Sequence, residues 1–290
     1  MKVNQLFNEG QVISFEVFPP RLRDPQADLR RIDDTVAAIA DLAPGFVSVT
    51  FGAGGTTHRA GTLELAARLK DTYGIEPVAH LPAAQLSTPA VDQLLGEFQA
   101  SGIENLLALR GDIPVGGRVA NDFAHASDLI AHIHAFGDFA VAGACYPEGH
   151  PESPSVVADI RHLRTKVDSG ADWLISQLFF DNQQFYQFQE RAACAGITVP
   201  ISAGVMPVLN LHQIEHMATM NGVTLPPKFT SMMARYADNK AAMRDAGIAY
   251  AIDQIVDLLV HGVRGIHIYT MDNPTVARRI VEAVGTLARA

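Results

Sequence analysis

The chain has 290 residues, 48% of which are hydrophobic, and a formal net charge of −9 at pH 7. The hydrophobic content supports a large core and excludes general disorder, and the negative charge disfavours nucleic acid or an anionic membrane as a partner. The two cysteines, Cys145 and Cys194, lie far apart in apolar segments, which is typical of a reducing compartment and gives no disulfide framework. The N-terminal segment has no signal-peptide pattern, and no apolar run reaches the roughly 18 residues of a membrane span, so we expect a cytoplasmic protein.

Short apolar runs rich in Val, Ile and Phe recur along the chain, and the first seven begin about 27 to 35 residues apart, the size of a βα repeat. They predict strands at residues 12–18, 46–51, 77–83, 105–111, 140–146, 173–180, 200–206 and 265–270. The segments between them, such as 28–43 and 88–101, carry apolar residues at the i, i+3, i+4 spacing of amphipathic helices. The last interval is longer and predicts extra helix at roughly 227–260, before the eighth strand.

This alternation places the chain in the α/β class. Repeated βα units whose strands are apolar on both faces favour a closed parallel barrel ringed by helices, a (β/α)8 or TIM barrel. An open, doubly wound sheet is the alternative. No low-complexity linker or change in composition divides the chain, so we expect a single domain over residues 1–290.

Polar residues stand at or just after the ends of the predicted strands. In a (β/α)8 barrel these ends meet at one rim, where chemistry gathers, so we expect a shared pocket there. For any single residue, a hydrogen-bonded rim position is an equally good interpretation. The candidates are Glu16, Thr50, His80, Arg110, Asp112, Tyr146, His150, Gln177, Asp181, Tyr269 and Thr270.

Glu16 is a lone carboxylate in the apolar run ISFEVFPPR. A buried, unpaired carboxylate is costly, so it must pair with a cation such as Arg21, take a proton, or face a cavity. Partial desolvation favours the protonated form, which a general acid near neutral pH requires. In LALRGD, Arg110 and Asp112 flank Gly111, which would let a flat ligand approach the backbone. A simple surface pair between Arg110 and Asp112 is the alternative.

Other sequence patterns give only weak support for a functional site. FGAGGTTH lacks the third glycine of a dinucleotide-binding motif, and no P-loop is present. His212 and His216 match the H-x-x-E-H form of a zinc site, but we expect them on an outer barrel helix without a third ligand, so no metal is expected. We expect Cys145 and Trp173 to pack in the interior, and His132 and His134 to be solvated helix positions.

Seven segments carry a resemblance to a known family. SFEVFPPR, FVSVTFGAGG, AHLPA, LALRGD, CYPEGHPES, DIRHLRTKVDSGAD and SQLFFD are similar, in order, to the strand-end motifs of methylenetetrahydrofolate reductase. The resemblance is strongest to the short bacterial form that has only the catalytic domain. It implies a barrel that binds FAD non-covalently and an oxidoreductase acting on CH–NH donors, with NADH or NADPH as co-substrate. The expected reaction interconverts 5,10-methylenetetrahydrofolate and 5-methyltetrahydrofolate and serves methionine synthesis.

The resemblance also implies roles for individual residues. Glu16 matches the general acid that protonates N10 of the substrate, and Asp112 matches the aspartate between flavin and pterin, whose charge stabilises the substrate cation. Gln177 matches the glutamine that contacts folate and, in turn, the nicotinamide, for which Thr50 is a further contact. The expected cofactor-binding residues are Thr50, Phe51, His80, Arg110, Gly111, Asp112, Ala126, Tyr146, His150, Asp159, His162 and Lys166.

Two further substrate positions depart from the family pattern. Leu211 stands where a phenylalanine often packs on the bound substrate or nicotinamide cofactor, and Asn273 stands where an arginine commonly approaches the substrate. His125, His162 and Thr165 also replace common residues near the flavin. The departures at Leu211 and Asn273 motivate an alternative in which the same chemistry runs mainly as oxidation of 5-methyltetrahydrofolate, with weak use of nicotinamide. A non-catalytic barrel that binds flavin or folate and, more distantly, a metal-dependent hydrolase are the other hypotheses; a homo-oligomer is expected.

Overall fold

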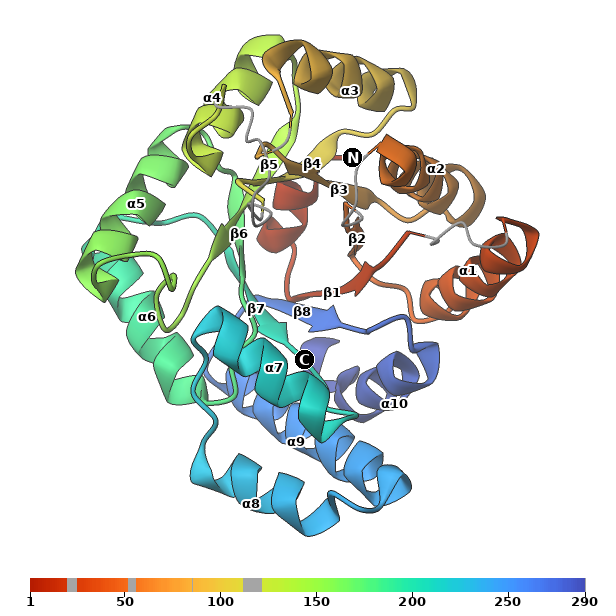
Figure 1. Cartoon of the computed structure of the whole chain (residues 1–290), viewed down its shortest axis with the longest axis vertical. Helices are drawn as coiled ribbons and strands as arrows, with labels where there is room; N and C mark the ends of the chain where they lie inside the picture. The colour runs from red at the N-terminus through yellow and green to blue at the C-terminus, as the bar shows by residue number, and fades with distance from the viewer. Residues whose placement is uncertain (20–24, 52–55, 85, 112–121, 290) are drawn as a thin grey trace.

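The strands form a closed parallel barrel. A computed structural model of the chain describes residues 1–19, 25–51, 56–84, 86–111 and 122–289. Within these residues eight parallel strands pair in chain order, and the first closes on the last (Figure 1). They are β1 Val12–Val17, β2 Phe46–Val49, β3 Pro77–Pro82, β4 Asn105–Leu109, β5 Ala140–Cys145, β6 Trp173–Ser176, β7 Ile201–Val205 and β8 Gly265–Tyr269. The predicted (β/α)8 barrel is confirmed, and the open doubly wound sheet is wrong.

Helices surround the barrel and follow the strands in alternation (Figure 1). They are α1 Pro25–Ala40, α2 Thr56–Tyr73, α3 Thr88–Ala100, α4 Ala126–Phe136, α5 Val156–Asp168, α6 Asn182–Cys194, α7 Leu211–Asn221, α8 Pro227–Tyr236, α9 Lys240–Val260 and α10 Pro274–Val284. Two short 3-10 helices, η1 Val3–Asn8 and η2 Leu287–Arg289, lie near the ends of the chain. The extra helix predicted before the eighth strand is present as α8 and α9. No helix of the described ranges is both long and apolar enough to cross a bilayer.

The strands end one to four residues earlier than predicted. The largest difference is at β6, which stops at Ser176 although the apolar run continues to Phe180. Leu178 and Phe180 leave the barrel and pack with Phe229 of α8 in a separate cluster. An apolar run therefore did not distinguish strand from a loop that is buried under an added helix.

The amino end of the barrel is plugged. Phe7 of η1, Phe46 of β2 and Trp173 of β6 are fully buried in one cluster there, and the rings of Phe46 and Trp173 meet edge to face. The side chain of Asn105 accepts the Val3 N–H at 2.7 Å and donates to the Met1 carbonyl at 3.0 Å. The interior packing predicted for Trp173 is confirmed, and an opening for ligands is left to the opposite rim.

Three smaller expectations have mixed outcomes. Cys145 is buried in β5, as predicted, and burial raises the pKa of its thiol. His134 is exposed, but His132 is not simply solvated, because its Nε2 lies 2.7 Å from Oδ1 of Asp92. Residues 212–216 lie in a helix, as predicted; this helix is α7, whose Met217 and Asn221 line the pocket described below, and α9 packs against β7 (Figure 1).

Candidate active site

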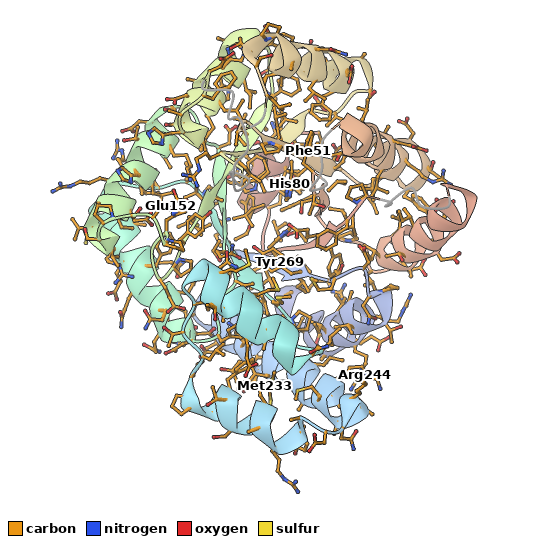
Figure 2. The ribbon with its side chains drawn as sticks, in the orientation of Figure 1. Phe51, His80, Glu152, Met233, Arg244 and Tyr269 are labelled. Carbon is orange, nitrogen blue, oxygen red and sulfur yellow. The ribbon has the colours of Figure 1, made fainter. Side chains whose placement is uncertain are left out.

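A pocket of about 600 Å³ opens at the carboxyl ends of the strands. Residues that belong to or directly follow β1, β3, β4, β5, β6, β7 and β8 line it, among them His80 and Tyr269 (Figure 2), as expected for the functional rim of a (β/α)8 barrel. The predicted site residues that line it are Glu16, His80, Arg110, Gly111, Ala126, Tyr146, His150, Asp159, His162, Lys166, Gln177 and Tyr269. One cavity therefore brings together side chains from most of the barrel.

Glu16 faces this cavity from β1, with 14% of its side chain exposed. Its Oε2 lies 3.6 Å from Nε2 of His80 on β3 and 4.0 Å from Nε2 of His267 on β8. Burial lowers the pKa of His80 to about 4, against the opposing attraction of Glu16, so its imidazole is neutral at pH 7. Of the alternatives open from the sequence, the carboxyl faces a cavity, and its nearest histidine supplies no positive charge; Arg21 lies outside the described residues.

His267 occupies the barrel interior beneath Glu16 and was not predicted. The ring is fully buried, stacks on Phe46, and places Nδ1 2.8 Å from the hydroxyl of Ser14 and Nε2 3.4 Å from that of Ser48. The alternation of GIHIYT could have indicated it, because every second residue of a barrel strand points inward. His267 and Tyr269 are both inward positions of β8.

Tyr269 crosses the barrel to β6. Its hydroxyl donates to the Ser176 carbonyl at 2.7 Å, and burial raises the pKa of the phenol, so that it remains a neutral donor. Gly204 of β7 makes this approach possible, because a Cβ there would lie 2.3 Å from the Ser176 carbonyl oxygen and 2.9 Å from the tyrosine oxygen. The hydrogen bond from Tyr269 to Ser176 thus links β8 to β6 across Gly204 of β7, beside the pocket.

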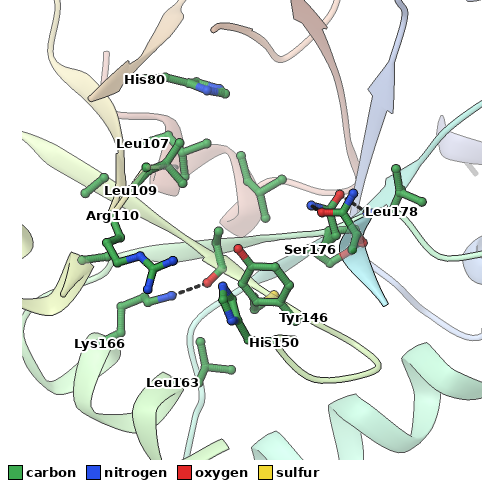
Figure 3. A pocket seen from close by; sticks show the side chains of 18 of the residues that line it. His80, Leu107, Leu109, Arg110, Tyr146, His150, Leu163, Lys166, Ser176 and Leu178 are labelled. Atoms are coloured by element: carbon green, nitrogen blue, oxygen red, sulfur yellow. Dashed lines mark hydrogen bonds between the residues drawn. The ribbon is translucent and has the colours of Figure 1, made fainter. Parts of the chain in front are cut away.

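One side of the pocket is polar, and we call Arg110, Tyr146, His150, Asp159 and Lys166 the polar wall. Figure 3 shows four of these side chains, Arg110, Tyr146, His150 and Lys166, close together. Lys166 reaches up from α5 and donates to the Ala144 carbonyl, and burial lowers the pKa of its ammonium group. Asp159, also from α5, is 8% exposed and accepts a hydrogen bond from Ser153 at 2.8 Å. The rings of Tyr146 and His150 meet edge to face, with centroids 4.6 Å apart.

Arg110 forms a two-pronged ion pair with Glu152 in the β5–α5 loop, with Nη2 2.7 Å from Oε1. This pairing lowers the pKa of Glu152. The guanidinium is therefore oriented by Glu152, which sequence reasoning did not include, while Asp112 lies outside the described residues. The ion pair spans the loops after β4 and β5 and helps to shape the outer edge of the polar wall.

The opposite side of the pocket is apolar, and we call Leu178, Met206, Met217 and Met271 the methionine wall. Leu178 and Met206 are almost completely buried, whereas Met217 of α7 and Met271 after β8 are partly exposed to the cavity. Gln177 lies next to this wall, and its amide bonds to Asn221 of α7 at 2.9 Å. Flexible thioethers adapt to flat aromatic rings, so this side of the pocket suits an aromatic ligand.

The polar wall fits a ligand that combines a flat ring with anionic groups. Among the residues that the structure describes, the buried Nε2 of His80 has no hydrogen-bond partner, which leaves a polar atom for a ligand. Gly111 lines the pocket with φ +83°, and a Cβ there would lie 2.8 Å from Cβ of Pro82, so this backbone conformation and the close packing of Pro82 both require glycine. Lys166 and Arg110 are the cationic side chains of this wall that phosphate oxygens could meet, although Arg110 is already paired with Glu152 and burial lowers the pKa of Lys166.

The sequence matches the family model of methylenetetrahydrofolate reductase over residues 2–285. The chain belongs to this family. The resemblance inferred from the strand-end motifs is therefore confirmed. Individual members of the reductase family also align with most of the chain. It is 33% identical to the 5,10-methylenetetrahydrofolate reductase of Pectobacterium carotovorum subsp. carotovorum over 278 residues, which are 96% of this chain and 91% of that protein.

The Escherichia coli K12 reductase is also 33% identical and shares 96% of this chain and 92% of its own. Methylenetetrahydrofolate reductase (NADH) 1 of Arabidopsis thaliana is 34% identical over 93% of this chain, but only 48% of the plant protein is matched. Among solved structures, a Clostridium thermocellum protein described as binding two copies of 5-methyl-5,6,7,8-tetrahydrofolic acid superposes with a TM-score of 0.65. It covers 99% of this chain and 97% of its own at 14% identity, which supports the shared fold alone.

Several residues that the family resemblance pointed to are not among the described residues that line the pocket. Asn273 instead caps α10, where its Oδ1 accepts the Val276 N–H at 3.3 Å. Phe51 packs on the core, and the buried hydroxyl of Thr50 has no hydrogen-bond partner within the described ranges. Asp112 lies outside the described residues, as does the side chain of Leu211, the first residue of α7.

Two rim candidates have local structural roles. Asp181 caps α6 by accepting the Gln183 N–H at 3.0 Å, and Thr270 donates its hydroxyl to the Glu16 carbonyl at 2.7 Å. For these two residues the interpretation as hydrogen-bonded rim positions holds. Neither side chain belongs to the described lining of the pocket.

Proposed function

We propose that this chain is an FAD-dependent methylenetetrahydrofolate reductase that forms 5-methyltetrahydrofolate from 5,10-methylenetetrahydrofolate, with NADH or NADPH as electron donor. The observation that carries the proposal is the Glu16 carboxyl, which faces a cavity between the polar wall and the methionine wall in a member of this family. Activity in the cytoplasm, a part in methionine synthesis and assembly as a homo-oligomer remain predictions.

The polar wall would hold the cofactor. His80, Gly111 and Tyr146 are candidates for the flavin ring, and His150, Asp159 and Lys166 for its chain and phosphates; Thr50, Phe51, Ala126 and His162 are further candidates from the resemblance. Bound reduced FAD would supply a hydride to the methylene carbon. The methionine wall, opposite the polar wall, is the surface left for the pterin or nicotinamide ring.

Glu16 is the proposed general acid. Its carboxyl O–H bond breaks as an N–H bond forms at N10 of the substrate, the bond between N10 and the methylene carbon breaks, and a cation conjugated to N5 results. Hydride addition to that carbon gives the methyl group, and N10 keeps the proton. Because His80 is neutral beside it, the carboxyl does not start from an ion pair with that residue. Asp112 would stabilise the cation, and Gln177 would hold the pterin.

A specific observation keeps the reverse direction as a second candidate. Asn273 replaces the arginine that is common in the family. Its side chain caps α10, and it is not among the described residues that line the pocket. This loss of a cation concerns the side of the site used by substrate and nicotinamide. Oxidation of 5-methyltetrahydrofolate with weak nicotinamide use is compatible with it.

The test records the visible spectrum of the purified protein without oxygen, before and after NADH or 5-methyltetrahydrofolate is added. A flavin spectrum bleached by NADH supports the reductase direction, and bleaching by the methyl-folate alone supports the second candidate. Glu16→Gln should lower the rate of the folate half-reaction at least about 100-fold and change the nicotinamide half-reaction less than about threefold. Glu64→Gln, at an exposed position of α2, is the matched control. A colourless protein that takes up no FAD would refute the proposal.

A further inference from the structure

The side-chain amide of Gln177 is held at both ends. Its Oε1 accepts the backbone N–H of Leu178 at 2.9 Å, and its Nε2 donates to Oδ1 of Asn221 at 2.9 Å. Gln177 follows β6, whereas Asn221 is the last residue of α7, so the bond joins a strand end to the helix that crosses the rim. Both residues line the pocket, and neither sequence patterns nor the family resemblance pointed to Asn221.

Backbone partners determine which way each amide points. The Leu178 N–H can only donate, so the atom that meets it must be the oxygen of Gln177. The Met217 carbonyl can only accept a hydrogen bond, and Nδ2 of Asn221 donates to it at 2.9 Å. Oδ1 of Asn221 must therefore face Gln177. A flipped Gln177 amide would oppose two oxygens at Asn221 and two N–H groups at Leu178. The arrangement therefore selects one orientation.

The end of α7 is itself fixed on the rim. Gly222 follows Asn221 with φ +65°, and Val223 N–H bonds back to the Ala218 carbonyl at 2.9 Å, which closes the helix in the manner of a glycine cap. Two residues later, the Thr224 N–H donates to the carboxylate of Glu148 in the β5–α5 loop at 3.0 Å. Asn221 thus acts from a position that is anchored on both sides of the pocket.

We propose that Asn221 is a positioning residue for the folate site: it holds the Gln177 amide so that one N–H is kept toward α7 and the other is presented to an acceptor atom of the folate ring. This inference rests on the proposed function, because it assumes that Gln177 contacts folate. Fixing the amide before binding removes the cost of ordering a flexible side chain when the ligand arrives. Asn221 acts through Gln177 and is not assigned a part in the proton or hydride transfer.

The first test uses Asn221→Ala, with Thr219→Ala as the control on the same helix. The Thr219 side chain is exposed, bonds only within α7 among the described contacts, and does not line the pocket. In Asn221→Ala the KM for 5-methyltetrahydrofolate should rise about tenfold while kcat changes less than about twofold, because ground-state orientation is lost and the acid remains. Thr219→Ala should match the unaltered protein. An unchanged KM in Asn221→Ala would overturn the inference.

A double-mutant cycle with Gln177→Leu separates positioning from direct contact. If Asn221 acts through Gln177, Asn221→Ala should weaken equilibrium binding of 5-methyltetrahydrofolate about tenfold alone and less than about twofold in the Gln177→Leu background. An equal loss in both backgrounds would show that Asn221 acts on the ligand or on α7 independently, and would overturn the inference.

A third readout needs no turnover. The side-chain N–H of Gln177 that meets Asn221 should be protected from exchange with solvent in the unaltered protein and in Thr219→Ala, and unprotected in Asn221→Ala, as measured by NMR. Protection that persists in Asn221→Ala would refute the inference even in an inactive protein. Absence of any folate turnover in the unaltered protein would refute the proposed function instead, so the two failures are distinguishable.

Discussion

The Oε2 atom of Glu16 lies 3.6 Å from the buried Nε2 of His80, a nitrogen without a hydrogen-bond partner in the part of the chain that the structure describes. The two groups stand on β1 and β3, on either side of β2, and both line the pocket. Because burial keeps the imidazole uncharged, this contact is not a salt bridge at neutral pH. It is an arrangement of a carboxyl and a neutral ring, each with capacity to bond a ligand.

His80 should make the stability of the protein depend on pH. Its pKa falls from 6.5 in the unfolded chain to about 4 in the fold, so the unfolded state binds more protons between these values and stability is lost as pH falls through this window. The free energy of unfolding should decrease by about 2 kcal/mol between pH 7 and pH 5 from this residue alone. Urea denaturation of the protein and of His80→Gln measures the difference. An equal pH dependence in both would contradict the prediction.

The phenol of Tyr269 should stabilise the closed rim. Tyr269→Phe removes the hydrogen bond to the Ser176 carbonyl without opening a large cavity, and should lower the free energy of unfolding by about 1 kcal/mol. Tyr236→Phe is the control, because this tyrosine is 37% exposed and lies on α8 away from the barrel. Both are measured by urea denaturation; equal effects would show that the bond to Ser176 contributes nothing.

Replacing glycine by alanine should change the free energy of unfolding in opposite directions at Gly204 and Gly96. Gly204→Ala places a Cβ 2.3 Å from the Ser176 carbonyl oxygen, so β6 and β7 must separate, and the free energy of unfolding should fall by about 2 kcal/mol or more. Gly96→Ala lies inside α3 with nothing within 4 Å of the new Cβ, and should raise it by about 0.5 kcal/mol. Thermal unfolding followed by circular dichroism checks both. A stabilised Gly204→Ala would contradict the close approach.

The barrel itself could be predicted from sequence because its determinants are local. Each strand is a short, mostly apolar run and is followed by helix, so the position and order of the strands follow from the sequence pattern. The ends of the strands were less certain, since Leu178 and Phe180 continue an apolar run while packing under α7 and α8. Their environment depends on helices that arrive 30 and more residues later in the chain.

Some residues of the candidate site could likewise be located from the sequence, and others could not. Glu16, His80 and Gln177 could be located because they stand late in predicted strands, where a barrel gathers its chemistry. Asn221 could not, because its place at the rim depends on the path of α7, and Glu152 could not, because its pairing with Arg110 joins two loops. Asn273 shows the reverse case: its position in the motif suggested a ligand contact, but its side chain caps α10.

Lys166 gives the sharpest test of the polar wall. Its side chain rises through space that Gly143 leaves open, since a Cβ at residue 143 would lie 2.7 Å from Cδ of the lysine, and its ammonium is buried beside the Ala144 carbonyl. Lys166→Met keeps the aliphatic stem and removes the charge, so affinity for FAD should fall at least about tenfold if the ammonium meets a phosphate. Lys240→Met, at an exposed position of α9, should leave it unchanged. Fluorescence titration of the flavin-free protein with FAD measures both affinities, and unaltered binding in Lys166→Met would place the phosphates elsewhere.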